Sequence, residues 1–432
     1  MIEPAGEAMA KLKFIVLAEL ALLFCVLVFL FYRTRSQGTL LEGYEVRSTT
    51  GVGDNLWKAV GVNVESRRYI DVSGGGEILD DVQAYRSNLL IRNQFDDVDL
   101  KVEPIKLNIN KSDVMVVLHI QKTGGTTFET YLVRHTNVKP PCHCTKMVSN
   151  YKSGQNKLIS DSEANRDVCT CLNDKGQDWM INRHATGWVC GVHADFTELT
   201  DCVDTWFNSQ DNEHRERRYH YVTLIRDPVI RFISEWLHVR RGATWKECRL
   251  HCDGRDASLA EVPFCFDHGT WAGVSFEEFI NCSSNMAFNR QTRMLANLSL
   301  SDCYRLNSTK TQKERDEIML QSAKQNLMKS FKFFSPLEYI EEGQLLFEQT
   351  FLGFSFTRKM TCKKYSAATN YAVLSEKHWD LVVERNLLDI RLYQFAKDLF
   401  LQRLARMNIP VQPRNHESKI VPAGLKYSVV TL

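Results

Sequence analysis

The chain has 432 residues, of which 44% are hydrophobic and 25% are charged, close to the composition of ordinary globular proteins. Collagen-like, coiled-coil and wholly disordered chains are therefore excluded. Fifty-four Lys and Arg residues against 52 Asp and Glu residues give a net charge of +2. This balance excludes a whole-molecule field that attracts polyanions, so any affinity for an acidic partner must come from local clusters.

Residues 14–32 form an apolar segment with one charged residue, about long enough to cross a bilayer as a helix. A cleaved signal peptide is the alternative, but its apolar run would be shorter and would end in small residues, whereas this one ends in Tyr32 and is followed by Arg33. The sequence predicts an uncleaved membrane anchor at 14–32, preceded by a cytoplasmic tail at 1–13.

Twelve of the 13 cysteines follow this segment, an even number that is compatible with six disulfides. Four glycosylation acceptor sequences, at Asn110, Asn281, Asn297 and Asn307, lie on the same side. Both features predict a body in the secretory lumen or outside the cell. The alternative is a cytosolic protein with zinc sites, but the one-residue gaps in 142–144 and 169–171 are tighter than usual zinc spacings. We expect no metal.

The rest of the chain divides into three parts. Residues 33–110 are rich in Gly, Ser, Thr and charged residues and show no sustained period, which predicts a stem with weak internal order. Residues 111–406 are the predicted catalytic body, and 407–432 are a C-terminal tail.

Within the body, residues 114–120 and 219–225 are short, nearly all-apolar runs, typical of buried strands in a parallel sheet. A turn and helix-compatible sequence follow each run, at 126–134 and 229–241. Further helices are expected at 276–295, 311–331 and 376–407. The order of strand, loop and helix predicts an α/β fold.

The first predicted strand leads into Gln121-Lys-Thr-Gly-Gly-Thr-Thr127. The two glycines permit close backbone approach, the following helix presents unpaired N–H groups, and Lys122 supplies a charge, as a phosphate site requires. Thr126 and Thr127 add hydroxyl donors that suit a helix cap. The lysine precedes the glycines, so this is not the loop of Mg-nucleotide hydrolases. A plain Gly-Gly turn with an exposed lysine is the alternative.

The second predicted strand ends at Arg226, directly before a turn and Pro228. Arg231, Ser234, His238 and Arg241 recur at helical spacing after it and are predicted to share one polar face, which suits a second phosphate. A solvated helix face with an Arg231–Glu235 pair is the alternative.

These two elements together resemble those of the Golgi sulfotransferases, and several blocks are similar to the heparan-sulfate 6-O-sulfotransferase family. The blocks are 118–128 (LHIQKTGGTTF), 186–195 (TGWVCGVHAD), 226–228 (RDP), 235–236 (EW), 241–246 (RGATWK) and 396–403 (AKDLFLQR). The resemblance implies a P-loop-like parallel sheet flanked by helices. It also implies a sulfuryl donor, 3′-phosphoadenosine 5′-phosphosulfate, and an acceptor, heparan sulfate, with the body in the Golgi lumen and no nucleic acid as partner.

The resemblance assigns roles by position. It implies His193 as the base that accepts the proton of the acceptor hydroxyl, and Lys122 as the cation at the leaving group. The implied donor-binding residues are His119, Ile120, Gln121, Lys122, Thr123, Gly124, Gly125, Thr126 and Thr127 at the phosphosulfate, Arg226 and Ser234 at the 3′-phosphate, and Thr361, Cys362, Lys363, Ala367 and Ala368 in a C-terminal loop. Arg183, Trp188, His193, His238 and Trp245 are implied to bind the sugar chain.

Two stretches depart from the family pattern. The segment between Cys144 and Cys169 is longer than the basic linker of the family, so only Lys157 and Arg166 are candidates for its substrate-binding lysines. The C-terminal loop lacks the arginine of the family, and Lys363 or Lys364 is expected to substitute. The departure in this loop keeps one further hypothesis open, a lumenal protein that binds heparan without catalysis.

Transfer to a sugar hydroxyl needs a base near neutral pH, which suits histidine. Among the 12 histidines, His193 is favoured because Gly191 allows close approach, Asp195 can orient it and Trp188 can stack on a sugar. His238 is the rival base, and a structural histidine is the alternative role of His193. Trp236 is assigned to the core. Two basic runs, 240–249 and 215–218, are weak candidates for binding the acceptor. Sulfation at a 2-hydroxyl or of chondroitin is the alternative activity.

Overall fold

A computed structural model describes residues 69–70, 80–146, 167–211, 215–267, 269–361 and 374–412. The predicted cytoplasmic tail, the anchor at 14–32, most of the predicted stem and the end of the tail lie outside these ranges. Within the described ranges, no helix combines the length and the apolar character that crossing a bilayer requires.

A parallel sheet of four strands forms the centre of the body, in the order β11–β8–β4–β7. The strands are β4 (Asp113–Leu118), β7 (Met180–Ile181), β8 (Arg218–Ile225) and β11 (Phe331–Pro336). Every residue of β4 is buried, as the apolar run at 114–120 predicts. The α/β prediction and the strands at 114–120 and 219–225 are confirmed, whereas β7 and β11 were not predicted.

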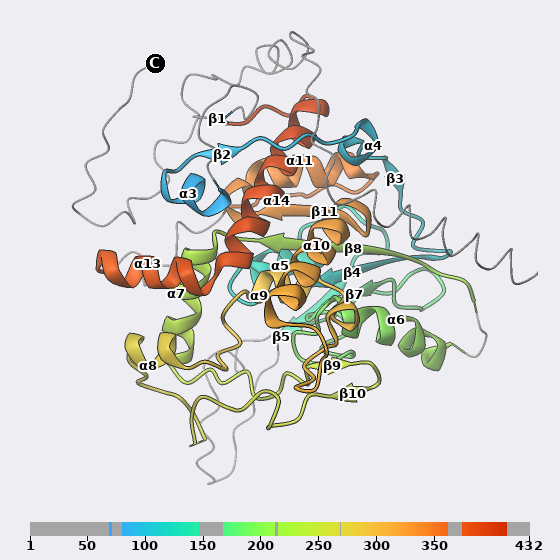
Figure 1. Ribbon diagram of the computed structural model, residues 1–432. Coiled ribbons are helices and arrows are strands. Elements are labelled where there is room, and N and C mark those ends of the chain that lie inside the picture. Colours follow the sequence, from blue (N-terminus) through green and yellow to red (C-terminus); the bar gives the residue numbers. More distant parts are fainter. Residues whose placement is uncertain are drawn as a thin grey trace, which may run out of the picture. The chain divides into compact units, whose positions relative to one another are not determined.

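Helices flank this sheet, and Figure 1 shows α10 and α14 in front of it, where both contact β11. The helices of the body are α5 (Gly125–Arg134), α6 (Phe196–Gln210), α7 (Pro228–Val239), α8 (Phe276–Asn281), α9 (Arg290–Leu295), α10 (Gln312–Lys329), α11 (Ile340–Thr350), α13 (Glu376–Arg385) and α14 (Leu387–Arg406). The predicted helices at 126–134, 229–241 and 311–331 are confirmed within two residues at each end.

Two predicted helices are each split in two. The range 276–295 contains α8 and α9, separated by a turn in which Cys282 is bonded to Cys265 and Asn289 takes a left-handed φ of 47°. The range 376–407 breaks at Asn386, whose buried side chain donates to the Val382 carbonyl and accepts the Asn289 N–H. Side-chain hydrogen bonds to the backbone compete with helix continuation at this point.

The described part of the predicted stem is folded onto the body. It contains α3 (Asp81–Arg86), β2 (Leu90–Ile91), α4 (Asp97–Leu100) and β3 (Ile105–Lys106), while β1 (Tyr69–Ile70) pairs with β2. Strand β3 pairs with β12 (Phe351–Leu352), and the Asn93 N–H donates to Asp398 of α14 (2.6 Å). These elements are too short to produce a period in the sequence, so the composition of residues 33–110 did not indicate them.

Ten of the described cysteines form five disulfides, which confirms the disulfide interpretation for these residues. The pairs are Cys142–Cys171, Cys144–Cys169, Cys190–Cys202, Cys252–Cys303 and Cys265–Cys282. Cys144–Cys169 joins β5 (His143–Lys146) to β6 (Asp167–Thr170), and Cys142–Cys171 joins the residue directly before β5 to the residue directly after β6. Cys248 is the free thiol of the described ranges, and Cys362 lies outside them.

Candidate active site

The two predicted phosphate loops lie side by side. Strands β4 and β8 are parallel neighbours, with Leu118 opposite Thr223, so the segments that follow them leave the same edge of the sheet. We call residues 119–124 the first loop and residues 226–227 the second loop. The Arg226 guanidinium donates to the Lys122 carbonyl (3.0 Å), which ties the second loop to the first.

The first loop forms a cradle at the start of α5. Gly124 takes a left-handed φ of 91°, and a Cβ there would lie 2.5 Å from Leu337. At Gly125, a Cβ would lie 3.0 Å from two atoms of the His119 ring. Helix α5 begins at Gly125, so Thr126 and Thr127 are exposed in its first turn and do not cap it, contrary to the prediction. The start of α5 is left open toward an anion.

Lys122 lies in this cradle with a positive φ of 69°. Burial, together with the nearby charges of Arg241 and Arg226, lowers the pKa of its ammonium to about 8, while Glu235 acts in the opposite direction. Cations that repel one another in a buried site are stabilised when an anion binds between them. The electrostatics of this cluster favour a bound phosphate or sulfate.

The second loop leads into α7, which Asp227 caps by accepting the Ile230 N–H (3.0 Å). Ser234 is buried two turns further on. Arg231 departs from the prediction, because its fully buried guanidinium contacts Glu235 and the Ala287 carbonyl. Burial raises the pKa of Glu235, but Arg290 and Arg231 outweigh it and hold the pKa at about 2. Arg231 thus belongs to a buried ion cluster and is not free for a phosphate.

The predicted acceptor-side residues form one continuous row. Ring centroids are 4.6 Å apart between Trp188 and His193, 5.1 Å between His193 and Trp245, and 5.2 Å between Trp245 and His238. We call these four residues the aromatic row. Arg183 lies over Trp188 (5.6 Å) and donates to Thr126 Oγ1 (2.9 Å). The structure therefore brings all five predicted acceptor residues together beside the first loop.

His193 is held in one tautomer by a backbone carbonyl. Its Nδ1 lies 3.1 Å from the His119 carbonyl oxygen, which can only accept, so Nδ1 carries the hydrogen and Nε2 carries the lone pair. Burial lowers the pKa of His193 well below 6.5, and the neighbouring charges of His119, Arg290 and Arg183 act in the same direction. The imidazole is neutral at pH 7, as a base must be.

Asp195 does not orient this histidine, contrary to the prediction. Its buried carboxylate caps α6 by accepting the Glu198 N–H (3.0 Å), and Glu198 accepts the Asp195 N–H in return (2.9 Å). His238, the rival base, is also neutral, because burial, Lys122 and Arg241 lower its pKa to about 4.

Comparison with known proteins identifies the family to which the chain belongs. The chain matches the model of the sulfotransferase family over residues 106–396. It is 44% identical, over 69% of its length, to heparan-sulfate 6-O-sulfotransferase 3-B of Danio rerio and to heparan-sulfate 6-O-sulfotransferase 3 of Homo sapiens. It is 42% identical, over 70%, to heparan-sulfate 6-O-sulfotransferase 2 of Gallus gallus.

The chain belongs to the heparan-sulfate 6-O-sulfotransferase family. The matched region includes both loops and the whole aromatic row. The alignments cover 66% of the Danio rerio protein, 60% of the Homo sapiens protein and 70% of the Gallus gallus protein.

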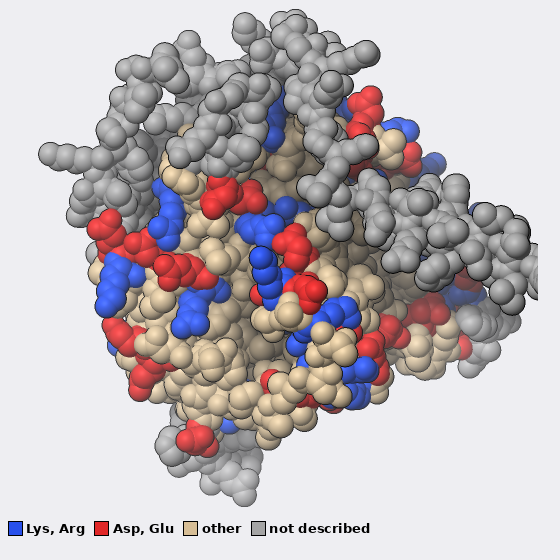
Figure 2. All heavy atoms as spheres, viewed as in Figure 1, with Lys and Arg blue, Asp and Glu red and all other residues tan. Residues whose placement is uncertain are grey.

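The two basic runs have different surroundings in this member of the family. In the run at 215–218, Arg217 is buried and donates to Asp211, while Arg218 pairs with Asp113 (2.8 Å), so both stabilise the fold. In the run at 240–249, Lys246 lies over Phe266 (4.6 Å), and Arg249 lies against Gly191 in the segment that precedes His193. Figure 2 shows positive and negative side chains interspersed over the described part of one face, in keeping with the nearly balanced charge.

Several predicted site residues lie in or next to the undescribed ranges. Thr361 is exposed at the end of a described range. Two other predicted donor residues, Ile120 and Thr123, are described and are buried within the first loop. The remaining candidates lie outside the described residues: Cys362, Lys363, Lys364, Ala367, Ala368, Lys157 and Arg166.

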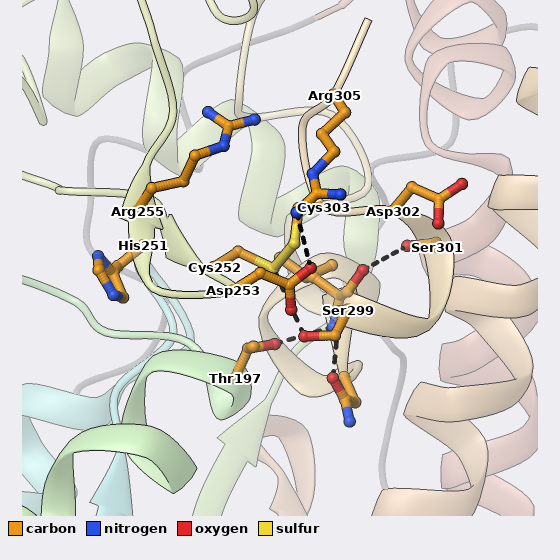
Figure 3. The surroundings of a disulfide bond; sticks show 12 residues. Thr197, His251, Cys252, Asp253, Arg255, Ser299, Ser301, Asp302, Cys303 and Arg305 are labelled. Atoms are coloured by element: carbon orange, nitrogen blue, oxygen red, sulfur yellow. Dashed lines mark hydrogen bonds and ion pairs between the residues drawn. A yellow bond between two sulfur atoms is a disulfide. The ribbon is translucent and has the colours of Figure 1, made fainter. Parts of the chain in front are cut away.

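One cluster of the described residues has the composition of a metal site, namely Cys252, Asp253 and Cys303. Figure 3 shows that the two sulfurs are bonded to each other and that Asp253 faces Arg305, with which it forms an ion pair (3.3 Å). Disulfide sulfurs are not thiolates and do not serve as the anionic ligands that a structural metal needs. The cluster is a cross-link with a surface ion pair.

Sequence reasoning missed two buried residues that support the site. Gln291 of α9 exchanges two hydrogen bonds with the Arg226 backbone, each 2.8 Å long. Glu129 lies on the inward face of α5 between Phe128 and Leu132 and contacts His119. A charged residue among apolar positions of a helix is the one signal that could have indicated Glu129.

Proposed function

We propose that the chain transfers a sulfuryl group from 3′-phosphoadenosine 5′-phosphosulfate to the 6-hydroxyl of glucosamine residues in heparan sulfate. The observation that supports this most is the neutral His193, whose Nδ1 hydrogen is bound by the His119 carbonyl beside two adjoining anion loops. The relatives named above are heparan-sulfate 6-O-sulfotransferases, which agrees with this activity.

The first loop fits the phosphosulfate end of the donor. Gly125 leaves room under the His119 ring, the first N–H groups of α5 face the cradle, and Lys122 adds a cation. The buried Gln121 Oε1 accepts no hydrogen bond from any described residue, which is consistent with a ligand donor at this point. Arg226 and Ser234, on the neighbouring element, are assigned to the 3′-phosphate.

The chemistry follows from these positions. The donor supplies an activated sulfuryl group and a phosphate as leaving group. His193 Nε2 takes the proton of the sugar hydroxyl while that oxygen attacks sulfur in line with the bond that breaks. Lys122 stabilises the negative charge that develops on the leaving phosphate. Trp188 and Trp245 flank His193 and provide faces on which a sugar ring can stack.

The direct test measures transfer of radiolabelled sulfate by the purified full-length chain to a panel of selectively desulfated heparins. We expect label on heparins that lack 6-O-sulfate, and disaccharide analysis should place it at the 6-hydroxyl. Lys122→Ala and His193→Ala should each lower kcat by about two orders of magnitude or more while the melting temperature stays near that of the wild type. Full activity in either variant would remove its assigned role.

The same transfer assay, with a binding measurement beside it, distinguishes two other functions. Label at a 2-hydroxyl, or on chondroitin, would assign the chain to another polysaccharide sulfation. A heparan-binding protein without catalysis would bind heparin but show no affinity for adenosine 3′,5′-bisphosphate, the spent donor. The cation cluster around Lys122 favours nucleotide binding over this last case.

We further propose that the chain is a single-pass type II protein of the Golgi membrane, anchored by residues 14–32, with its body in the lumen. The five disulfides support an oxidising compartment. In sealed microsomes, the body should resist added protease until detergent is present, and an N-terminal tag should be removed without detergent. A body digested in intact microsomes would contradict this orientation.

A further inference from the structure

Glu129 joins the two sides of the site through one buried carboxylate. Its side chain is fully buried on α5, and its Oε1 contacts Nδ1 of His119. Its Oε2 accepts the backbone N–H of Arg183 (3.2 Å). The backbone of the same residue accepts a longer hydrogen bond from the Asn182 side chain (3.5 Å). A single residue therefore fixes the start of the first loop and the segment that carries Arg183.

His119, the partner of Glu129, touches the reaction centre with both its ring and its backbone. The carbonyl of His119 holds the hydrogen of His193 Nδ1, which sets the tautomer of the base. The ring lies over Gly125 at the start of α5 and has its centroid 5.0 Å from that of His193. Any rotation of the His119 side chain thus changes the cradle, and a shift of its backbone changes the base.

Packing alone does not require a carboxylate at position 129. Its neighbours on the inward face of α5, Phe128 and Leu132, are apolar, and a buried carboxylate is costly unless it is paired and hydrogen-bonded. A carboxylate can only accept a hydrogen bond, so its contact with Nδ1 of His119 requires a hydrogen on Nδ1. The same contact fixes the ring so that its Nε2 edge lies over Gly125. The geometry is that of a group that orients a histidine at a reaction site.

We propose that Glu129 is a positioning residue for sulfuryl transfer, which holds the His119 ring against the donor cradle and keeps the Arg183 segment in register with it. This role rests on the proposed function. Glu129 itself does not touch either substrate, and it acts through His119 and the Arg183 backbone.

The test compares Glu129→Gln with the wild type in the full-length chain. The amide keeps the size of the side chain but offers one acceptor where the carboxylate offers two, so it cannot accept from both partners. We expect kcat to fall about 10- to 100-fold, because misplacement of a reacting group by about 1 Å can cost about 100-fold. The affinity for adenosine 3′,5′-bisphosphate should change less than about threefold, since Arg226 and Ser234 are untouched.

The matched control is Glu342→Gln on α11, another buried carboxylate, which accepts the Gln412 N–H (3.1 Å). It should keep the kcat of the wild type. If Glu129→Gln does not melt cooperatively, Glu129→Asp decides, because it keeps the carboxylate but is one methylene too short to contact both His119 and the Arg183 backbone. It should fold and show the same loss of kcat.

Three outcomes separate the hypotheses. Transfer by the wild type with an unchanged kcat in Glu129→Gln overturns the positioning role and leaves the proposed function intact. The role is also overturned if kcat falls only in proportion to the fraction of protein that still binds adenosine 3′,5′-bisphosphate, or if Glu342→Gln shows the same loss. Either pattern would report misfolding. A wild-type chain that transfers no sulfate overturns the proposed function and this role with it.

Discussion

At the scale of one residue, the surroundings of His193 suit the role of base that we propose for it. The ring is enclosed by other rings, so its charged form loses hydration and its pKa falls well below 6.5. A carbonyl holds the hydrogen on Nδ1, so no carboxylate is needed to fix the tautomer. The lowered pKa makes the imidazole a weaker base but keeps it neutral, and hence able to accept a proton, near pH 7.

This environment predicts the acid side of the pH profile. A base must be unprotonated, and a depressed pKa keeps it so down to a lower pH, so kcat/KM should be flat between pH 6.5 and 7.5 and should fall only below 6.5. The measurement is kcat/KM for sulfate transfer from pH 4.5 to 8, since this ratio reports the free enzyme. A decline centred at or above 6.5 would contradict the assignment of His193.

Lys122 determines how the affinity for the nucleotide changes on the alkaline side. Its pKa of about 8 means that the free site loses its cation as the pH rises above that value, so the affinity for adenosine 3′,5′-bisphosphate should weaken above pH 8. In Lys122→Arg the guanidinium stays charged, and the affinity should stay constant up to pH 9.5. Isothermal titration across this range distinguishes the two variants, and parallel curves would show that another group titrates.

At this scale the sequence predicted which residues gather but not what each one contacts. Arg183, Trp188, His193, His238 and Trp245 adjoin, as the resemblance implies. Asp195 is predicted to orient His193, yet its carboxylate caps α6 by accepting the Glu198 N–H. Arg231 has the spacing of a polar face, but the arginine–glutamate network that buries it comes from α9, far along the chain.

At the scale of elements, the two loops were predictable because each follows a buried apolar strand, and parallel strands bring their ends to one edge. The breaks within 276–295 and 376–407 were not, since they depend on partners that only the fold supplies. Asn289 and Asn386 bond to each other across these breaks. The elements at 80–110 were missed for a similar reason, because each is stabilised by contacts with α14 or β12.

These early elements predict the effect of truncation. A fragment that begins at Lys111 loses the Tyr85 hydroxyl bond to Asp227 (2.8 Å), the Asn93 bond to Asp398 and the β3–β12 pairing. At about 1 kcal/mol for each hydrogen bond, plus the exposed face of α14, we expect it to be several kcal/mol less stable than a fragment that begins at Asp80. Urea unfolding of both fragments measures the difference.

The control for this comparison is Tyr85→Phe in the longer fragment. It removes one hydroxyl and should cost about 1 to 2 kcal/mol, because the partly buried Asp227 carboxylate loses a donor. If the two fragments unfold at the same urea concentration, residues 80–110 contribute nothing to the stability of the body.

At the scale of the whole body, the disulfides contribute to the free energy of unfolding. Cys252–Cys303 closes a separation of 51 residues, and Cys265–Cys282 closes one of 17. In the chain-entropy model these loops correspond to about 4 and about 3 kcal/mol of stability. Replacing each pair by serines should destabilise the protein in that order, measured by urea unfolding under oxidising conditions. The reverse order would mean that native contacts, and not loop length, decide.

The bond from the Arg226 side chain to the Lys122 carbonyl has a consequence for how the nucleotide leaves. Because the Arg226 guanidinium bonds to the backbone of the first loop, a displacement of Arg226 also removes a hydrogen bond from Lys122, so the two proposed phosphate sites are coupled. Adenosine 3′-phosphate and adenosine 5′-phosphate each carry one of the two phosphates of the spent donor, so each should bind more weakly and dissociate faster than adenosine 3′,5′-bisphosphate.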